Sequence, residues 1–176
     1  MQIRKISATA PAWLSILHAF FNLCFAAQQQ THTVLFTLER STNSNQITYE
    51  WVSHSNGLEN GEIHAYWKML QTDGHLEELT ALEQSRVYGA TLTDQSKKEA
   101  KITLKAFQDH PIIIRKLNSD DQPKAFLKIS NQEIVLSNIY VHLEGWLYPR
   151  VKSIDFFGSS ALDHSPLIVN LAGLIK

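Results

Sequence analysis

Short alternations of apolar and polar residues recur along most of the chain, and this period of two limits the fold more than any other feature. Residues 34–39, 47–52 and 62–69 each place an apolar or aromatic side chain at every second position. This is the period of a half-buried β-strand, whose successive side chains point to opposite faces of a sheet. Further strands are predicted over residues 100–107, 111–117, 124–130, 133–143 and 151–157. Such regular short strands predict a mainly β fold, either an antiparallel β-barrel or a sandwich.

Turn residues and a final apolar run complete the strand pattern. The connector Asp109-His110-Pro111 predicts a turn between two of the strands, because Asp and Pro both favour turns. Residues 167–175 form a last apolar run, which predicts a closing strand. A short buried helix is the alternative there, since periodicity alone does not separate the two.

One segment follows a helical period instead. Leu76, Leu79, Leu82 and Val87 recur at the spacing of one helix face, and Gly89 is typical of the residue that follows a helix. The sequence therefore predicts one amphipathic helix that lies on the sheet or plugs it.

The first residues have the order of a secretory signal peptide. The basic residues Arg4 and Lys5 precede an apolar stretch over 13–25, and the small residues Cys24 and Ala26 occupy the −3 and −1 positions of a cleavage site. An uncleaved anchor is the alternative, but the stretch is shorter than the ~20 residues that span a bilayer. We expect residues 1–26 to be a signal peptide.

Cleavage after Ala26 leaves residues 27–176 as a single β-rich domain. The one cysteine of the chain is removed with the signal peptide, so the mature protein has no thiol. This suits an oxidising compartment and excludes a cysteine nucleophile. We expect an exported protein, periplasmic or secreted, without a stable membrane span after cleavage.

Composition excludes several function classes. Sixteen Lys and Arg residues stand against seventeen Asp and Glu residues, a net charge of −1, which removes the electrostatic basis for nucleic-acid binding. The histidines are scattered without metal-ligand spacing, and the sequence has no phosphate-binding glycine motif or serine nucleophile elbow. We therefore expect no metal site, no cofactor and no nucleic-acid partner.

Two charged residues occupy positions where the pattern requires apolar ones. Arg40 has the parity of the inward-facing residues of the first strand, and Glu83 lies within the predicted helix stripe. A buried charge needs a partner or a path to water. We expect Arg40 and Glu83 to form a structural charge pair that holds the helix to the sheet; the alternative is that both reach solvent at the ends of their elements.

The third strand contains the best candidate site. Glu62, His64, Tyr66 and Lys68 project from one face of it, while Trp67 belongs to the opposite, core face. In a barrel the polar face could line a cavity, and in a sandwich it would be wet. His64, Tyr66, Trp67 and Lys68 are the candidate ligand-binding residues, in a pocket bounded by Tyr66, Trp67 and the helix. The rival hypothesis is a hydrolase that uses Glu62, His64 and Tyr66 as acid, base and hydrogen-bonding groups.

Four short motifs together resemble a known family. They are Leu38-Glu39-Arg40-Ser41, Ala65-Tyr66-Trp67, Glu78-Leu79-Thr80 followed by Glu83, and Tyr88-Gly89. They resemble a family of small exported bacterial proteins that is described as a domain of unknown function, over residues 34–158. The resemblance implies a signal peptide before one β-rich domain, and it implies no reaction, cofactor or catalytic residue. It singles out Arg40, Tyr66, Trp67, Glu83, Tyr88 and Gly89.

The fold pattern, the many aromatic residues and the absence of a catalytic motif favour a binding protein over an enzyme. We expect a non-enzymatic, envelope-associated module that holds a small amphipathic ligand or docks on another envelope component.

Overall fold

The computed structural model describes residues 30–54, 57–118, 122–145 and 147–172, so the predicted signal peptide lies outside the described residues. The elements, in chain order, are β1 (Thr31–Arg40), β2 (Asn43–Ser53), β3 (Gly61–Lys68), β4 (Leu76–Glu78), α2 (Ala81–Arg86), β5 (Ala90–Gln95), β6 (Glu99–Leu104), β7 (Phe107–Arg115), β8 (Lys124–Ile129), β9 (Gln132–Glu144), β10 (Arg150–Ser160) and β11 (Pro166–Ala172). The mainly β prediction is confirmed. None of the helices in these residues is long and apolar enough to cross a membrane.

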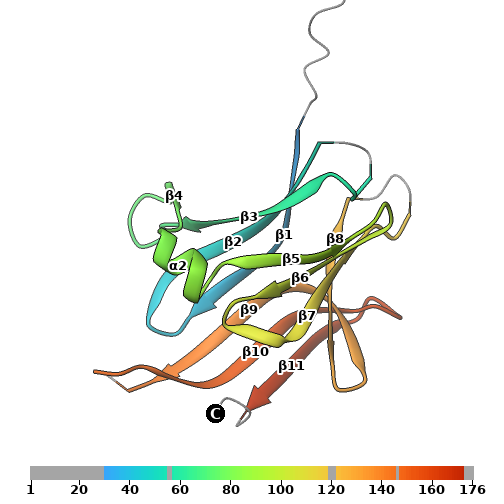
Figure 1. Cartoon of the computed structure of the whole chain (residues 1–176). Coiled ribbons are helices and arrows are strands. Elements are labelled where there is room, and N and C mark those ends of the chain that lie inside the picture. Colours follow the sequence, from blue (N-terminus) through green and yellow to red (C-terminus); the bar gives the residue numbers. More distant parts are fainter. Residues whose placement is uncertain (1–29, 55–56, 119–121, 146, 173–176) are drawn as a thin grey trace, which may run out of the picture.

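All eleven strands belong to one sheet that branches at β9 (Figure 1). The first residues of β9 pair with β8, from Ile129↔Gln132 to Phe126↔Val135. Its later residues pair in parallel with β1, from Thr37↔Asn138 to Arg40↔Val141. One branch therefore runs β1-β2-β3-β4 and the other runs β8-β7-β6-β5, while β10 and then β11 continue from β9 on its other edge.

The sheet curls into an open half-barrel that brings the ends of the two branches together (Figure 1). The amide of Gln95, at the end of β5, donates a hydrogen bond to the carbonyl oxygen of Gly61, at the start of β3, over 2.8 Å. The Leu58 N–H donates to the carbonyl oxygen of Lys97 over 3.3 Å. The first bond joins β5 to β3, and the second joins the loops beside these two strands. No strand ladder connects β5 to β3 among the described residues, so the barrel is incomplete.

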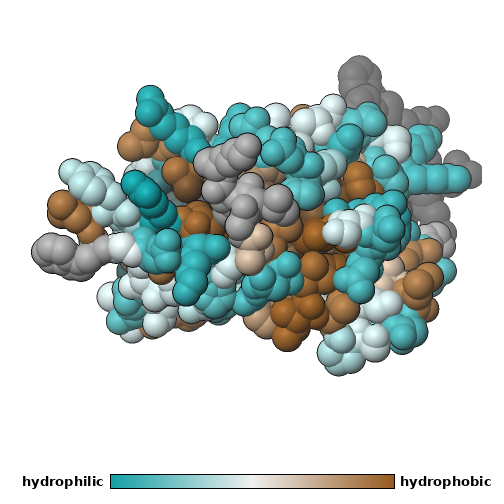
Figure 2. Space-filling model, turned by 90° about the horizontal axis from the view of Figure 1, so that it is seen from below, coloured by the Kyte–Doolittle hydropathy of each residue, from teal (hydrophilic) through white to brown (hydrophobic). Residues whose placement is uncertain are grey.

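The core lies inside the curl, where the predicted alternation places it. Ile47, Tyr49 and Trp51 alternate along β2 and are each fully buried. The rings of Phe36 and Tyr49 stack across β1 and β2 with their centroids 4.6 Å apart. Hydrophobic residues also reach the surface: on the face seen from below they gather in one area among hydrophilic residues (Figure 2).

The helix is shorter than the sequence pattern predicts. Leu76 lies in β4, which pairs with the edge of β3 (Lys68↔Leu76), and α2 begins only at Ala81. Thr80 and Glu83 form a capping box, which fixes this start because each side chain accepts a hydrogen bond from the other residue's backbone N–H. Leu76 and Leu82 are 61% and 64% exposed, so the predicted apolar stripe is wrong apart from the buried Leu79.

The predicted turn at Asp109-His110-Pro111 is also wrong, because these residues lie within β7. The turn is at Lys105 and Ala106, between β6 and β7. Pro111 is tolerated in the strand because it lies at an irregularity in the pairing of β7 with β6 and before the first pair of β7 with β8. The final apolar run forms a strand over Pro166–Ala172, as predicted, and not the alternative short helix.

Candidate functional site: an apolar pocket with an arginine at one end

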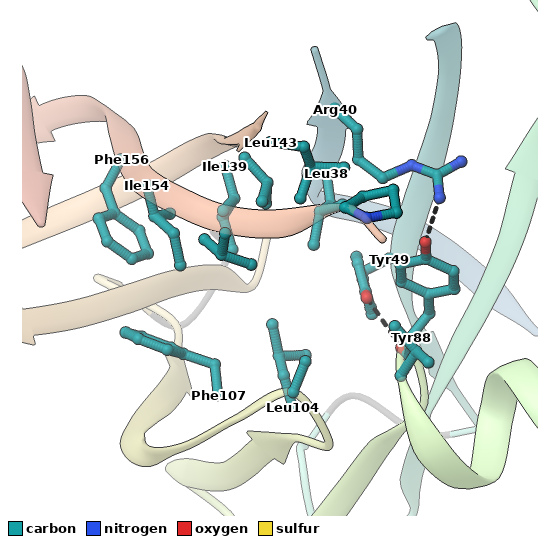
Figure 3. Close-up of a pocket in the computed structure, with 15 residues that line it drawn as sticks. Leu38, Arg40, Tyr49, Tyr88, Leu104, Phe107, Ile139, Leu143, Ile154 and Phe156 are labelled. Carbon is teal, nitrogen blue, oxygen red and sulfur yellow. Dashed lines mark hydrogen bonds between the residues drawn. The ribbon is translucent and has the colours of Figure 1, made fainter. Parts of the chain in front are cut away.

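An apolar pocket of about 250 Å³ opens on the inner side of the half-barrel (Figure 3). Its walls come from both branches of the sheet, from β10 and from the segment after α2. The apolar lining residues are Leu38, Val87, Leu104, Ala106, Phe107, Ile139, Val141, Leu143, Pro149, Val151, Ile154 and Phe156. The three lining residues with polar groups are Arg40, Tyr49 and Tyr88.

The regular alternation of three neighbouring strands produces one apolar wall. Leu38 of β1 is the register partner of Ile139 of β9, and Ile139 is in turn the partner of Phe156 of β10. Leu104 and Phe107, at the two ends of the β6–β7 turn, form the facing wall (Figure 3). The pocket is thus the space between the β1-β9-β10 wall and the β6–β7 turn.

Arg40 lies at one end of this pocket, at the end of β1, beyond a register shift that separates it from Leu38. Its Nη1 donates a hydrogen bond to the hydroxyl oxygen of Tyr88. Its guanidinium carbon lies 4.9 Å from the ring centroid of Trp67 and 5.3 Å from that of Tyr88, so two aromatic faces flank the cation. The Nε atom is buried and has no hydrogen-bond partner. The Arg40 side chain thus lies on the inner side of β1, as its parity predicts.

Tyr88 is held in place by its backbone. The buried Tyr49 hydroxyl donates to the Tyr88 carbonyl oxygen over 2.8 Å, and the Tyr88 N–H donates to the Glu83 carbonyl oxygen over 2.8 Å. At the next residue, Gly89, the chain passes close to the backbone of α2. A Cβ at this position would lie 1.8 Å from the carbonyl oxygen of Gln84, so the chain can follow this path only with glycine there. Both residues of the Tyr88-Gly89 motif therefore fix the geometry at the polar end of the pocket.

Burial and local charges set the protonation of this region. Burial raises the pKa of Tyr88, and the adjacent Arg40 charge only partly opposes it, so the phenol stays protonated at neutral pH. Burial likewise raises the pKa of Tyr49. Burial also pushes the pKa of Glu83 upward, but hydrogen bonds from Thr80 and Trp67, with the Arg40 charge, outweigh it and lower that pKa.

Arg40 and Glu83 do not form the direct charge pair that the sequence suggested. Within the described residues no ion pair joins them, and Trp67 lies between them instead. The Trp67 Nε1–H donates to Glu83 Oε1 over 3.1 Å, while the Trp67 ring lies against the Arg40 guanidinium. The Glu83 carboxylate also accepts from the Thr80 backbone N–H over 2.9 Å. The helix is thus connected to β1 indirectly, through an indole.

None of the four ligand-binding candidates from the third strand lines the apolar pocket. Tyr66 and Lys68 lie on the opposite face of β3 from the buried Trp67, and Lys68 is exposed. The Tyr66 hydroxyl donates to Glu50, and burial together with this carboxylate raises the pKa of Tyr66 to about 12. His64 lies within 3.0 Å of Glu78, on β4.

The residues of the hydrolase hypothesis therefore face different partners. Glu62 is exposed, His64 contacts Glu78, and Tyr66 contacts Glu50. His64 also borders a separate, more open hollow of about 380 Å³ between β3 and α2, which Ile63, Leu79 and Gly89 help to line. In the described part of the chain, no group of three or more His, Cys, Asp or Glu side chains is placed to hold a metal ion.

Sequence reasoning missed most of the pocket residues as a site. The apolar residues were expected as core, and their alternation does not distinguish a filled interior from one with a cavity. Only Arg40 had a signal of its own, as a charge on an apolar parity, and Tyr88 was marked by the resemblance alone.

The geometry defines a class of protein: a curled, open β-sheet that encloses an apolar pocket with a single guanidinium at one end. Residues 36–169 match the family described as Domain of unknown function (DUF4833), and the chain belongs to this family. The resemblance found in the sequence is confirmed at this level. No curated protein and no solved structure matches the chain.

Proposed function

We propose that the folded domain is a non-enzymatic binding module that holds a small, largely apolar ligand in the pocket between β1, β9, β10 and the β6–β7 turn. The observation that supports this most directly is the pocket itself: about 250 Å³ bounded by twelve apolar residues and only three with polar groups. Ligand sites are typically concave and mainly apolar, with a few polar groups that fix orientation. An apolar cavity of about 150 Å³ already admits a benzene molecule.

The lining offers binding groups and no set of groups for acid–base chemistry. Its titratable side chains are Arg40, Tyr49 and Tyr88, and the two phenols have raised pKa values. A general base works best with a pKa near the operating pH, which these residues do not provide. We therefore favour binding over hydrolysis for this site.

Binding of a neutral apolar probe tests the proposal. Fluorescence of N-phenylnaphthylamine is titrated with the wild-type domain, with Val151→Trp and with the matched control Lys152→Trp. Val151 is half-buried and lines the pocket, whereas its neighbour Lys152 is exposed. We expect saturable binding by the wild type and by Lys152→Trp, and at least about tenfold weaker binding by Val151→Trp, because the indole occupies the pocket.

Equal probe binding by the two tryptophan variants would place the ligand elsewhere. An absence of binding by the wild type would discard the ligand and leave docking on an envelope component as the function. Thermal melts of all three proteins separate loss of the pocket from loss of the fold.

We also propose that the domain works outside the cytoplasm, as a periplasmic or secreted protein. The support is the order of charge, apolar stretch and small residues over residues 1–26. Expression of the full chain in a Gram-negative host, followed by intact mass measurement of the periplasmic fraction, is expected to give a chain that begins at Ala27. An uncut chain in the cytoplasm would overturn the proposal.

A further inference from the structure

We propose that the ligand is a single-chain aliphatic carboxylate, whose carboxylate binds Arg40 and whose chain lies along the apolar walls. This inference rests on the proposed binding function and adds the chemical class of the ligand. Arg40 and Phe156 lie at opposite ends of the row of lining residues, so the pocket has one cationic end and one apolar end (Figure 3).

The guanidinium of Arg40 has no directly paired carboxylate among the described residues. It is partly buried and carries the positive charge of an arginine side chain, and its neighbours on the pocket side are apolar or aromatic. Its Nη1 bonds to a neutral phenol, and its buried Nε has no partner. A cation taken out of water is costly unless an anion or hydrogen-bond acceptors compensate it. A ligand carboxylate would supply both, in the planar geometry that a guanidinium favours.

Glu83, the acidic residue whose charge acts on Arg40, already has other partners. Its carboxylate accepts hydrogen bonds from Trp67 Nε1 at 3.1 Å, from the Thr80 N–H at 2.9 Å and from the Thr80 hydroxyl at 2.8 Å. Movement of Glu83 toward Arg40 would break both the capping box and the bond to the indole. The anion that completes the site must therefore come from outside this cluster.

Tyr88 provides a second donor beside the guanidinium. Its hydroxyl oxygen accepts from Arg40, and within the described residues its own hydrogen is donated to no acceptor. The anchored backbone of Tyr88 keeps this O–H next to the cation. A carboxylate at this place can accept from the guanidinium with one oxygen and from the phenol with the other.

The size of the pocket limits the apolar part of the ligand. Its volume of about 250 Å³ lies just below the range of about 300–1,000 Å³ that is usual for drug-sized ligands. One medium-length chain fits this space, and the two chains of a phospholipid do not. The facing residues Leu104, Phe107, Ile139 and Ile154 offer it hydrocarbon contacts and no polar side-chain group.

A pair of ligands with the same chain and different head groups tests the inference. Calorimetry compares decanoate with decanol for the wild-type domain, for Arg40→Met and for the matched control Arg150→Met, which removes an exposed arginine at the start of β10. We expect the wild type and Arg150→Met to bind decanoate at least about tenfold more tightly than decanol, since a hydrogen bond to a charged group is worth about that much. Arg40→Met should bind the two equally and should retain decanol.

The outcomes separate the inference from the proposed function. Equal binding of both ligands by the wild type, or a retained decanoate preference in Arg40→Met, would overturn the carboxylate assignment and leave an apolar-ligand module. No binding of either ligand would overturn both. If Arg40→Met does not fold, Tyr88→Phe decides the question, because it keeps the ring and should reduce the decanoate preference about threefold; an unchanged preference would count against the inference.

Discussion

On each face of the curled sheet, a tyrosine hydroxyl meets a charged side chain, and the two pairs differ in what else surrounds the charge. On the outer face of β2 and β3, Glu50 accepts a hydrogen bond from the Tyr66 hydroxyl and lies 3.2 Å from His32. On the inner face, Arg40 has the Tyr88 hydroxyl, two aromatic rings and an unpartnered Nε.

The difference shows why residue types alone do not locate a site. The outer charge, the Glu50 carboxylate, has two polar partners and access to water, so its hydrogen bonding requires no ligand. The inner charge lies between the apolar pocket and a more open, polar hollow that Glu39 and Gln46 help to line, and no carboxylate of the described residues forms an ion pair with it. An incomplete set of partners beside a cavity, and not a concentration of polar residues, distinguishes the inner face as the candidate binding site.

The largest effect should separate the two faces of a single strand. Trp67 and Tyr66 are neighbours on β3, but Trp67 is 8% exposed and Tyr66 lies on the outer face. We expect Trp67→Ala to lower the free energy of unfolding by about 3–5 kcal/mol, because it opens a cavity in the core. Tyr66→Ala should cost about 1 kcal/mol, the worth of a cross-strand pair. Urea denaturation measures both, and equal losses would show that the faces do not differ in packing.

A smaller effect should come from the two tyrosine hydroxyls themselves. Tyr49→Phe leaves the carbonyl oxygen of Tyr88 without its donor in a buried place, so we expect a loss of about 1–3 kcal/mol. Tyr66→Phe leaves Glu50 with His32 and with water, and we expect about 0.5 kcal/mol. The same denaturation experiment applies, and a larger loss for Tyr66→Phe would reverse the comparison.

Most of the strands could be predicted because they bury one face, which imposes a period of two on the sequence. The short edge strands could not. Leu76–Glu78 becomes β4 by pairing with Lys68 and its neighbours on β3. Three residues are too few for a strand period, so the sequence does not predict this pairing. The branch at β9 was equally hidden, because parallel pairing of residues so distant as Leu38 and Ile139 depends on the whole sheet.

The candidate site was predictable only where one residue broke the pattern. Arg40 was found because a charge at an apolar parity needs an explanation. Its contacts with Tyr88 and Trp67 could not be predicted, because the path of the chain around α2 is what brings these two side chains to Arg40. The polar face of β3 drew attention by its composition, although its residues find partners on β2 and β4.

The stability of the inner cluster should depend on pH through Glu83. The pKa of Glu83 is lower in the folded protein than its ordinary value of 4.5, so the ionised form stabilises the fold. This contribution is complete above the unfolded pKa and is lost as the pH falls through the folded one. We expect the stability difference between the wild type and Glu83→Gln to be largest near neutral pH and to shrink below about pH 4.5. Thr80→Ala, which removes the capping hydroxyl, should flatten the same part of the wild-type profile; a difference that grows in acid would contradict this account.

The smallest expected effect tests the position of the helix. Leu82 is 64% exposed on α2, although the helical spacing of leucines placed it on the buried face. Leu82→Gln should change the free energy of unfolding by less than about 0.5 kcal/mol, because it removes no buried contact and Gln is a good helix former. The matched change Leu79→Gln buries a polar side chain in the core, so it should cost several times more. If Leu82→Gln were as costly as a core substitution, about 2–5 kcal/mol, the helix would have to rest on the sheet with its leucine face inward. That arrangement would move the capped end of α2, and with it Glu83 and Tyr88, away from Arg40.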